Sequence, residues 1–387
     1  MLAKATARLG TETAFEVLAK ARALEAEGRS VVHLEIGEPD FDTPPHIVEA
    51  AIRALRDGYT HYGPSAGLPE ARAAVADYAG RMRGITIPAE HVVIMPGAKP
   101  VLFFGILSLV NPEDEVIYPN PAFPIYESVI NYAGARAVPI ALREDNDFNL
   151  DVEDLARAIT PRTKMLILNS PANPTGGVLS RGDIEAIAAL AQKHDFWVLA
   201  DEIYARILYE GEHFSIMSLP GMPERTILLD GHSKTWAMTG WRLGYGIAPL
   251  PVAQMMSRFM TNCNSCTASF VQKAGIAALQ GSQSDAEAMV AEFKRRRDLI
   301  VDGLNAIPGI SCRRPRGAFY VFPNVTQLGM KSAACADGLL REAGVASLAG
   351  TAFGAHGEGY LRFSYANSQA NIREALSRVA RFVEARR

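Results

Sequence analysis

The chain has 387 residues, of which 48% are hydrophobic, so it is long enough to bury a large core in two domains, or in one large and one small domain. Its 39 basic residues nearly balance 42 acidic ones, and the net charge of −3 argues against a broad nucleic-acid or anionic-membrane surface. The composition therefore favours a small, local ligand.

The first thirty residues carry charges throughout, including Lys4, Arg8 and Glu12, and lack the continuous apolar stretch of a secretion signal. We therefore expect a cytoplasmic protein. The most apolar run, PVLFFGILSLV from Pro100 to Val110, is shorter than the roughly 20 residues that a membrane-spanning helix needs. It predicts a buried helix of the core.

Short β-rich apolar runs alternate along the chain with longer helical patterns. In chain order these runs are HVVIMPG, DEVIYPNP, KMLILNSP, FWVLADE and RTILLDGHSK, and each ends in turn-forming or polar residues. This alternation predicts an α/β fold whose large domain contains a mainly parallel sheet covered by helices on both faces.

Two of the intervening helices are defined by their periodicity. Ser180 as N-cap and Asp183 three residues later predict a helix start, and one face of that helix is apolar: Ile184, Ile187, Ala188 and Ala191. A second stripe lies near the C-terminus: Ile372, Leu376, Val379 and Val383.

From about Ala286 the pattern changes to long charged helices and short strands, GAFYVFPNV and GYLRFSYA. This change predicts a smaller α+β domain, which we expect the first forty or so residues to join. The predicted division is a large domain over 46–285 and a small domain over 1–45 and 286–387.

Polar side chains follow three of the predicted strands. Asn173 comes after KMLILNS, Asp201 and Tyr204 come after FWVLA, and Ser233 and Lys234 come after RTILLDGH. Each has an alternative explanation as a turn residue, a helix cap or an ordinary exposed residue, and taken singly that explanation is favoured for all of them except Lys234 and Asp201. Because ligands bind beyond the carboxyl ends of parallel strands, their recurrence there favours one shared site.

These motifs, together with GEPDFDTP, NPTG, DEIY, SKTWAMTGWRLGY and LRFS, resemble the fold-type-I pyridoxal-phosphate-dependent aminotransferases of class I/II, the aspartate aminotransferase superfamily. The resemblance spans nearly the whole chain and implies a sheet of the seven-stranded type. It also implies a transaminase that moves the amino group of an L-amino acid, with aspartate-like or broad specificity, to a 2-oxo acid such as 2-oxoglutarate by a ping-pong mechanism. A pyridoxal-phosphate-dependent C–S lyase, or a related enzyme acting at Cβ or Cγ, shares the cofactor residues and stays open as an alternative.

The resemblance assigns a cofactor role to each strand-end residue. Lys234 is similar to the family's Schiff-base lysine, whose freed amine then serves as general acid and base. Asp201 would keep the ring nitrogen protonated, and Asn173 and Tyr204 would donate to the phenolic oxygen. Phe123 in YPNPAFPIY would stack on the ring, where many relatives have tryptophan or tyrosine; phenylalanine keeps the aromatic face without a polar group.

The phosphate of the cofactor would be bound by the motif MPGAK and by the segment after Lys234. The resemblance places the backbone amides of Ala98 and Lys99 at the start of the buried helix, where the helix dipole favours an anion. Ser233 and Arg242 would complete this cup. Tyr62 in THYGPSAG is similar to a tyrosine that reaches the phosphate from the neighbouring subunit, which implies a homodimer with shared active sites.

The resemblance also implies how the substrate binds. Arg362 in YLRFS would bind the α-carboxylate as a planar fork, with Asn173 beside it, and Gly37 in EIGEPDF would add a backbone contact as the N-terminal segment closes. No arginine or lysine is assigned to a second carboxylate of the substrate, so aspartate, alanine, aromatic and other donors stay open.

Other classes of protein fit less well. A P-loop requires glycine before its lysine, whereas Ser233 precedes Lys234, and a transcription regulator of this fold would need an added DNA-binding region. Cys263 and Cys266 form a lone C-x-x-C without a second ligand pair at matching spacing, so we predict no metal site.

Overall fold

A seven-stranded sheet lies at the centre of the computed structural model, which describes residues 2–386. Its strand order is β2-β8-β7-β6-β5-β3-β4. The strands are β2 (Val92–Met95), β3 (Glu115–Asn120), β4 (Arg136–Ala141), β5 (Thr163–Asn169), β6 (Trp197–Asp201), β7 (Thr226–Gly231) and β8 (Gly244–Ile247). Only β8 runs antiparallel to its neighbours β2 and β7, which confirms the predicted mainly parallel sheet.

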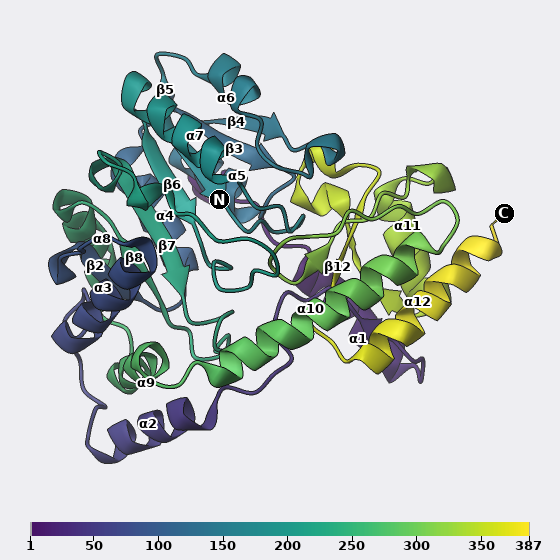
Figure 1. Ribbon diagram of the computed structural model, residues 1–387, viewed down its shortest axis with the longest axis horizontal. Coiled ribbons are helices and arrows are strands. Elements are labelled where there is room, and N and C mark those ends of the chain that lie inside the picture. The colour runs from purple at the N-terminus through teal and green to yellow at the C-terminus, as the bar shows by residue number, and fades with distance from the viewer. Residues whose placement is uncertain (1, 387) are drawn as a thin grey trace.

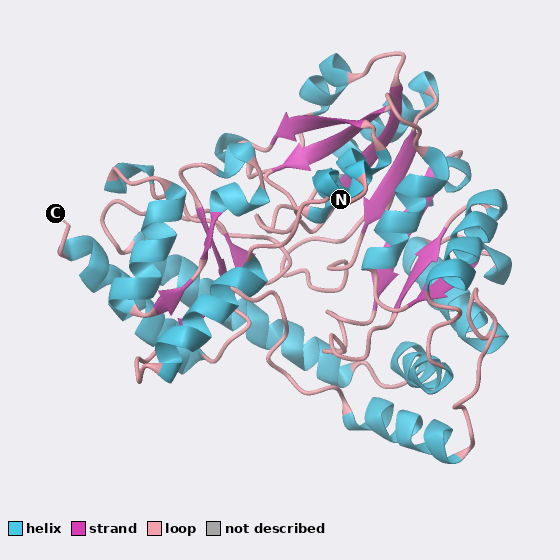
Figure 2. Cartoon of the chain, turned by 180° about the vertical axis from the view of Figure 1, so that it is seen from behind, coloured by secondary structure: helices cyan, strands magenta, loops and turns pink. Residues whose placement is uncertain are grey.

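Helices cover both faces of this sheet because its strands are apolar on both sides (Figures 1 and 2). In β5, Met165 and Ile167 belong to one hydrophobic cluster, whereas Leu166 and Leu168 belong to the other. The first cluster includes α4 (Lys99–Leu109), α5 (Ile125–Ala133) and α8 (Leu250–Cys263). The second includes α2 (Pro45–Arg56), α3 (Pro69–Arg83), α6 (Val152–Ala158), α7 (Arg181–His194) and α9 (Ser269–Gln280).

The predicted helices form where the sequence pattern placed them. The apolar run becomes α4, and α7 begins with a capping box in which the Asp183 amide donates to Ser180 Oγ at 3.1 Å and the Ser180 amide donates back at 3.1 Å. The C-terminal stripe lies on α12 (Gln369–Glu384), where three of its four residues are fully buried and Leu376 is partly buried.

The N- and C-terminal segments form a second, smaller group of elements. Strand β1 (Val32–His33) pairs in parallel with β10 (Val345–Ala346), and a three-stranded antiparallel sheet has the order β11-β12-β9: β11 (Leu348–Ala349), β12 (Leu361–Ser364) and β9 (Tyr320–Val321). The helices here are α1 (Ala14–Ala26), α10 (Ser284–Asn305), α11 (Ser332–Gly338) and α12. The α/β fold with a smaller α+β unit is thus confirmed.

Helix α10 connects the two groups: it begins beside α9 and extends to α12, against which it packs (Figure 1). The predicted boundaries at 45/46 and 285/286 fall in the first turns of α2 and α10. The exact division into domains stays a prediction.

The carboxyl ends of the parallel strands lie together at one edge of the central sheet. Asn169 and Asp201, the last residues of β5 and β6, are paired in register. This edge is where an open α/β sheet binds its ligand. Among residues 2–386, no helix has the length and apolar composition to cross a membrane.

Candidate active site

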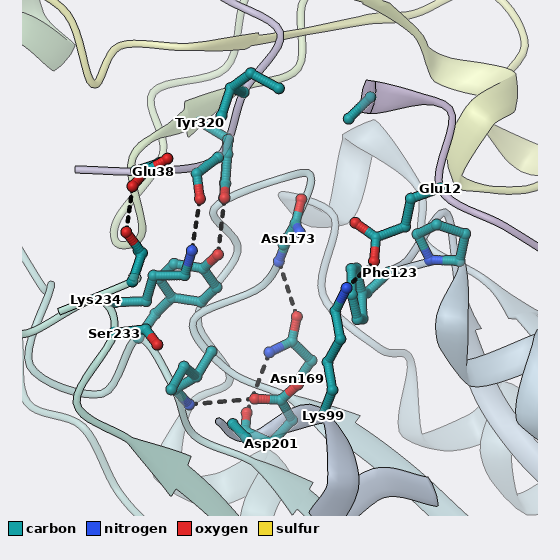
Figure 3. A pocket seen from close by; sticks show the side chains of 18 of the residues that line it. Glu12, Glu38, Lys99, Phe123, Asn169, Asn173, Asp201, Ser233, Lys234 and Tyr320 are labelled. Atoms are coloured by element: carbon teal, nitrogen blue, oxygen red, sulfur yellow. Dashed lines mark hydrogen bonds and ion pairs between the residues drawn. The ribbon is translucent and has the colours of Figure 1, made fainter. Parts of the chain in front are cut away.

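A cavity of about 570 Å³ lies at this edge and is lined by both groups of elements (Figure 3). Eleven of the twelve residues predicted from the sequence line it: Gly37, Ala98, Lys99, Phe123, Asn173, Asp201, Tyr204, Ser233, Lys234, Arg242 and Arg362. Segments from most of the chain length therefore converge on one cavity. The strand-end argument grouped Asn173, Asp201, Tyr204, Ser233 and Lys234, and the family resemblance supplied the others.

Lys234 lies three residues after β7 and extends its amine into the cavity. Its Nζ donates to the carbonyl oxygen of Gly37 at 2.5 Å and lies 5.6 Å from the centre of the Phe319 ring. Burial lowers the pKa of Lys234 to about 8, and the positive charge of Arg362 acts in the same direction. A lower pKa increases the fraction of neutral amine, which is the form that attacks a carbonyl carbon.

Asp201 ends β6 and is buried, with defined partners for both carboxylate oxygens. Tyr126 donates its hydroxyl to Oδ2 at 2.6 Å, and the amide of Ile203 donates to Oδ1 at 3.2 Å. Burial nevertheless raises the pKa of Asp201 to about 6. A positively charged group beside it would favour its ionised form, so the site suits a protonated ring nitrogen.

Two asparagines connect the ends of β5 and β6 with the loop that follows β5. Asn169 donates through Nδ2 to the Asp201 carbonyl at 3.1 Å and accepts from the Asn173 amide at 2.8 Å. Asn169 is not among the predicted site residues, although it is the last residue of a predicted strand and the strand-end rule applies to it. Asn169 thereby fixes where Asn173 lies.

Tyr204 is paired with a tyrosine of the smaller group of elements. Its hydroxyl oxygen lies 2.8 Å from that of Tyr320, which is the first residue of β9 and also lines the cavity. A Cβ atom on Gly37 would lie 2.2 Å from the Tyr320 hydroxyl oxygen, so only glycine permits this approach. Neither Tyr126 nor Tyr320 is among the predicted site residues. Tyr126 lies in the segment YPNPAFPIY and Tyr320 in GAFYVFPNV, both noted above for other reasons.

An anion-binding cup lies where α4 begins. Ala98 is the N-cap of this helix and Lys99 is its first residue, and both line the cavity. The free backbone amides and the positive end of the helix dipole therefore lie at the cavity wall. A Cβ on Gly97 would lie 2.3 Å from an Arg242 guanidinium nitrogen, which places that cation against the same turn. Ser233, which is buried, adds a hydroxyl. These donors fit a phosphate group.

Arg362, on β12, is almost fully buried and is held on several sides. Its guanidinium donates to the carbonyl of Glu35 and, at 3.2 Å, to Oδ1 of Asn173. The group also lies 4.5 Å from the Tyr320 ring centre and 4.9 Å from that of Phe353. Its Nε has no hydrogen-bond partner within the described part of the chain. This fixed, partly unpaired fork suits a planar carboxylate.

Phe123 lies in the main cavity, whereas Tyr62 lies outside it. Phe123 lines the cavity and packs edge-on against Tyr126, with ring centres 5.7 Å apart. Tyr62 is 90% exposed and lies in a second hollow, which shares Arg242 with the first. Within a single chain Tyr62 therefore does not line the main cavity, and its contribution across a subunit interface stays a prediction.

A buried ionic network lies directly behind Asp201. Arg83, the last residue of α3, contacts Glu202 Oε2 at 2.6 Å and Asp230 Oδ2 at 3.6 Å. Glu202 also accepts from the hydroxyl of Ser215 at 2.5 Å and contacts His213 Nε2 at 2.9 Å. This network anchors the segment that carries Asp201.

We expect Arg83→Met to lower the free energy of unfolding by about 3–5 kcal/mol, because it leaves two buried carboxylates without their cation. Urea denaturation of the cofactor-free protein at pH 7 measures this. Arg81→Met is the control, since Arg81 forms an exposed pair with Asp77 on the same helix and its loss should cost less than about 1 kcal/mol. Equal destabilisation by the two changes would contradict the prediction.

Because of the same network, the stability of the fold should fall at acid pH. Burial opposes ionisation of Glu202, but the charges of Arg83 and His213, together with the hydrogen bonds from His213 and Ser215, outweigh it and lower the pKa of Glu202 from 4.5 to about 2. The stabilisation from Glu202 is therefore complete above pH 4.5 and is lost as the pH falls towards 2. The difference between Arg83→Met and the parent protein should shrink over that range.

The sequence is similar to those of known aminotransferases, in agreement with the geometry of the cavity. The family profile for aminotransferase class I and II matches residues 29–379. An aspartate aminotransferase of Pyrococcus horikoshii is 44% identical over 357 residues, which cover 92% of this chain and 91% of that protein. An aromatic-amino-acid aminotransferase of Thermococcus litoralis is 41% identical and covers 92% of each chain.

Solved structures agree with this assignment. The aspartate aminotransferase of Thermus thermophilus with maleate superposes with a TM-score of 0.95, at 40% identity and over 99% of both chains. The fold and these relatives define an amino-acid aminotransferase. The chain belongs to the class I and II aminotransferase family, which confirms the resemblance and the enzyme class predicted from its motifs.

Proposed function

We propose that this aminotransferase holds pyridoxal 5′-phosphate in the cavity around Lys234 and moves the amino group of an L-amino acid to a 2-oxo acid, such as 2-oxoglutarate, in a ping-pong sequence. The supporting observation is the convergence in one cavity of an amine with a lowered pKa, a buried carboxylate and an anion-binding cup. Those three groups match the aldehyde, ring nitrogen and phosphate of that cofactor.

Bound pyridoxal phosphate supplies an electron sink for the bond to the substrate Cα. In this proposal Lys234 anchors the cofactor and then moves a proton at Cα, and Asp201 holds the proton on the ring nitrogen. Tyr204 and Asn173 would donate to the phenolic oxygen, and Phe123 would stack on the ring. The amides of α4, with Ser233 and Arg242, bind the phosphate.

The substrate would be oriented by its α-carboxylate, which every amino acid and 2-oxo acid shares. Arg362 would bind that group, since its guanidinium is buried and its Nε has no hydrogen-bond partner among residues 2–386. The carbonyl of Gly37 accepts from the Lys234 amine, so the N-terminal segment lies over the site and limits access of water.

We further propose a homodimer in which Tyr62 reaches the phosphate of the neighbouring subunit. The exposure of Tyr62 and its position in a hollow beside Arg242 support this arrangement. A cytoplasmic location is supported by four free cysteines in the described chain, Cys263, Cys266, Cys312 and Cys335, because a reducing compartment keeps thiols unpaired.

Half-transamination tests the proposed reaction. When the cofactor-loaded enzyme is mixed with one L-amino acid and no 2-oxo acid, we expect bound pyridoxal phosphate to become pyridoxamine phosphate with release of one equivalent of the matching 2-oxo acid. Chromatography of the cofactor extracted from the protein, over a panel of donors, measures this. Release of pyruvate with ammonia or sulfide, without pyridoxamine phosphate, would refute the transaminase and favour the C–S lyase.

A further inference from the structure

One ion pair in the cavity wall has no part in the proposed chemistry. Lys99 Nζ contacts the carboxylate of Glu12, which lies just before α1 and thus comes from the N-terminal segment (Figure 3). The other cavity-lining cations, Lys234, Arg242 and Arg362, are assigned to the cofactor or to the α-carboxylate. Of the cations that line the described cavity, Lys99 alone is therefore left for a substrate side chain.

Glu12 and Lys99 line the same cavity as Lys234 and Arg362, beside Phe123. Lys99 Nζ is 5.4 Å from the centre of the Phe123 ring, and the side chain of Glu12 is only 18% exposed. Burial is the main reason that the pKa of Tyr320 is raised, and the negative charge of Glu12 adds to it. Glu12 also lines the same cavity as Tyr320, Phe353 and Arg362.

The rest of this wall is largely apolar. Phe15, Ile36, Leu348 and Phe353 line the cavity together with Phe123. Besides Glu12 and Asp201, the cavity is lined by one more acidic side chain, Glu38, which accepts a hydrogen bond from the Thr239 hydroxyl. An uncharged, aromatic or large aliphatic side chain would find apolar contacts here and would leave the Glu12–Lys99 pair intact.

We infer that Glu12 determines side-chain specificity by keeping Lys99 paired, so that uncharged donors are preferred over dicarboxylic ones. This inference rests on the proposed function. A second carboxylate must compete with Glu12 for Lys99 and is repelled by Glu12 at the same time, which is discrimination by an unfavourable charge. The same competition lowers the efficiency of 2-oxoglutarate relative to a 2-oxo acid with an uncharged side chain.

The test compares the cofactor-loaded enzyme with Glu12→Gln and with the matched control Glu16→Gln. Glu16 is an exposed carboxylate four residues further along, outside the cavity, so its variant has the same net charge. The dissociation constants of succinate, a dicarboxylate, and of 3-phenylpropionate, an aromatic monocarboxylate, are measured by titrating the cofactor absorbance. Neither probe has an amino or keto group, so binding is measured without turnover.

We expect Glu12→Gln to tighten succinate binding about 10-fold and to change 3-phenylpropionate binding less than about 2-fold. Glu16→Gln should change neither. In the double variant with Lys99→Gln the gain for succinate should disappear, since the gain requires the released cation. Thermal denaturation of each variant confirms that the proteins compared are folded.

An unchanged ratio of the two affinities in Glu12→Gln would overturn the inference, as would an equal gain for both probes or a gain that survives Lys99→Gln. Failure of the proposed function has a different signature, because the parent enzyme would then form no pyridoxamine phosphate with any amino acid, charged or uncharged.

Discussion

Replacing Lys234 with alanine lowers turnover by at least about 10⁴-fold and removes the covalent link between protein and cofactor. Both effects are expected because, in the proposed function, one amine provides the anchor and the proton transfer. The amine lies in the cavity with a pKa lowered by burial to about 8, and alanine supplies no substitute. Borohydride reduction followed by mass spectrometry of the tryptic peptide measures the link, and a steady-state assay measures turnover.

Lys193→Ala, which removes an exposed lysine of α7, is the control and should leave both readouts unchanged. Added methylamine should restore part of the turnover of Lys234→Ala, since a small amine can occupy the space of the lost side chain and accept the proton. Retention of the borohydride-stable link in Lys234→Ala would show that another lysine is the anchor.

Asp201→Asn is expected to lower kcat about 10³-fold, although the phosphate cup still binds the cofactor. An amide is neutral and cannot stabilise a protonated ring nitrogen, so the cofactor withdraws electrons less strongly. Single-turnover kinetics with a good donor separates this loss from weaker binding. Tyr126→Phe, which removes one hydrogen bond to Asp201 at 2.6 Å, should cost only about 10-fold.

Asp201→Asn should not destabilise the cofactor-free protein at pH 7. Burial raises the pKa of Asp201 from 3.8 to about 6, so above pH 6 the folded protein maintains an unfavourable buried anion that the amide removes. We expect the denaturation midpoint of Asp201→Asn to equal or exceed that of the parent protein. A lower midpoint together with the lost activity would mean that Asp201 acts mainly through folding.

Most of the large sheet was predictable because its strands are short apolar runs that end in polar turns. Strands β4 and β8 were not singled out. The first contains Pro139, which disfavours a strand interior, and it forms the edge of the sheet; the second, Gly244–Ile247, has two glycines in four residues. Their place in the sheet comes from tertiary pairing and not from local preference.

The candidate site also has a part that the sequence predicts and a part that it does not. Residues after parallel strands converge because the sheet aligns strand ends, so Asn173, Asp201 and Lys234 could be grouped before any coordinates. The contacts of Glu12 with Lys99 and of Tyr320 with Tyr204 join segments that are far apart in sequence and carry no local signal. Such pairs depend on how the smaller group of elements packs against the sheet.

The parallel pairing of β1 with β10 also sets an order of events during synthesis. Val32 leaves the ribosome roughly 300 residues before its partner Val345, which at about 5–20 residues per second is a delay of some 15–60 s. During that time the large sheet can form, but Gly37 and Arg362 cannot yet meet around it. A nascent chain therefore completes its large sheet first, and the proposed substrate-binding residues Gly37 and Arg362 come together only after β12 is complete. Until then, the many charges of the first thirty residues keep the N-terminal segment hydrated.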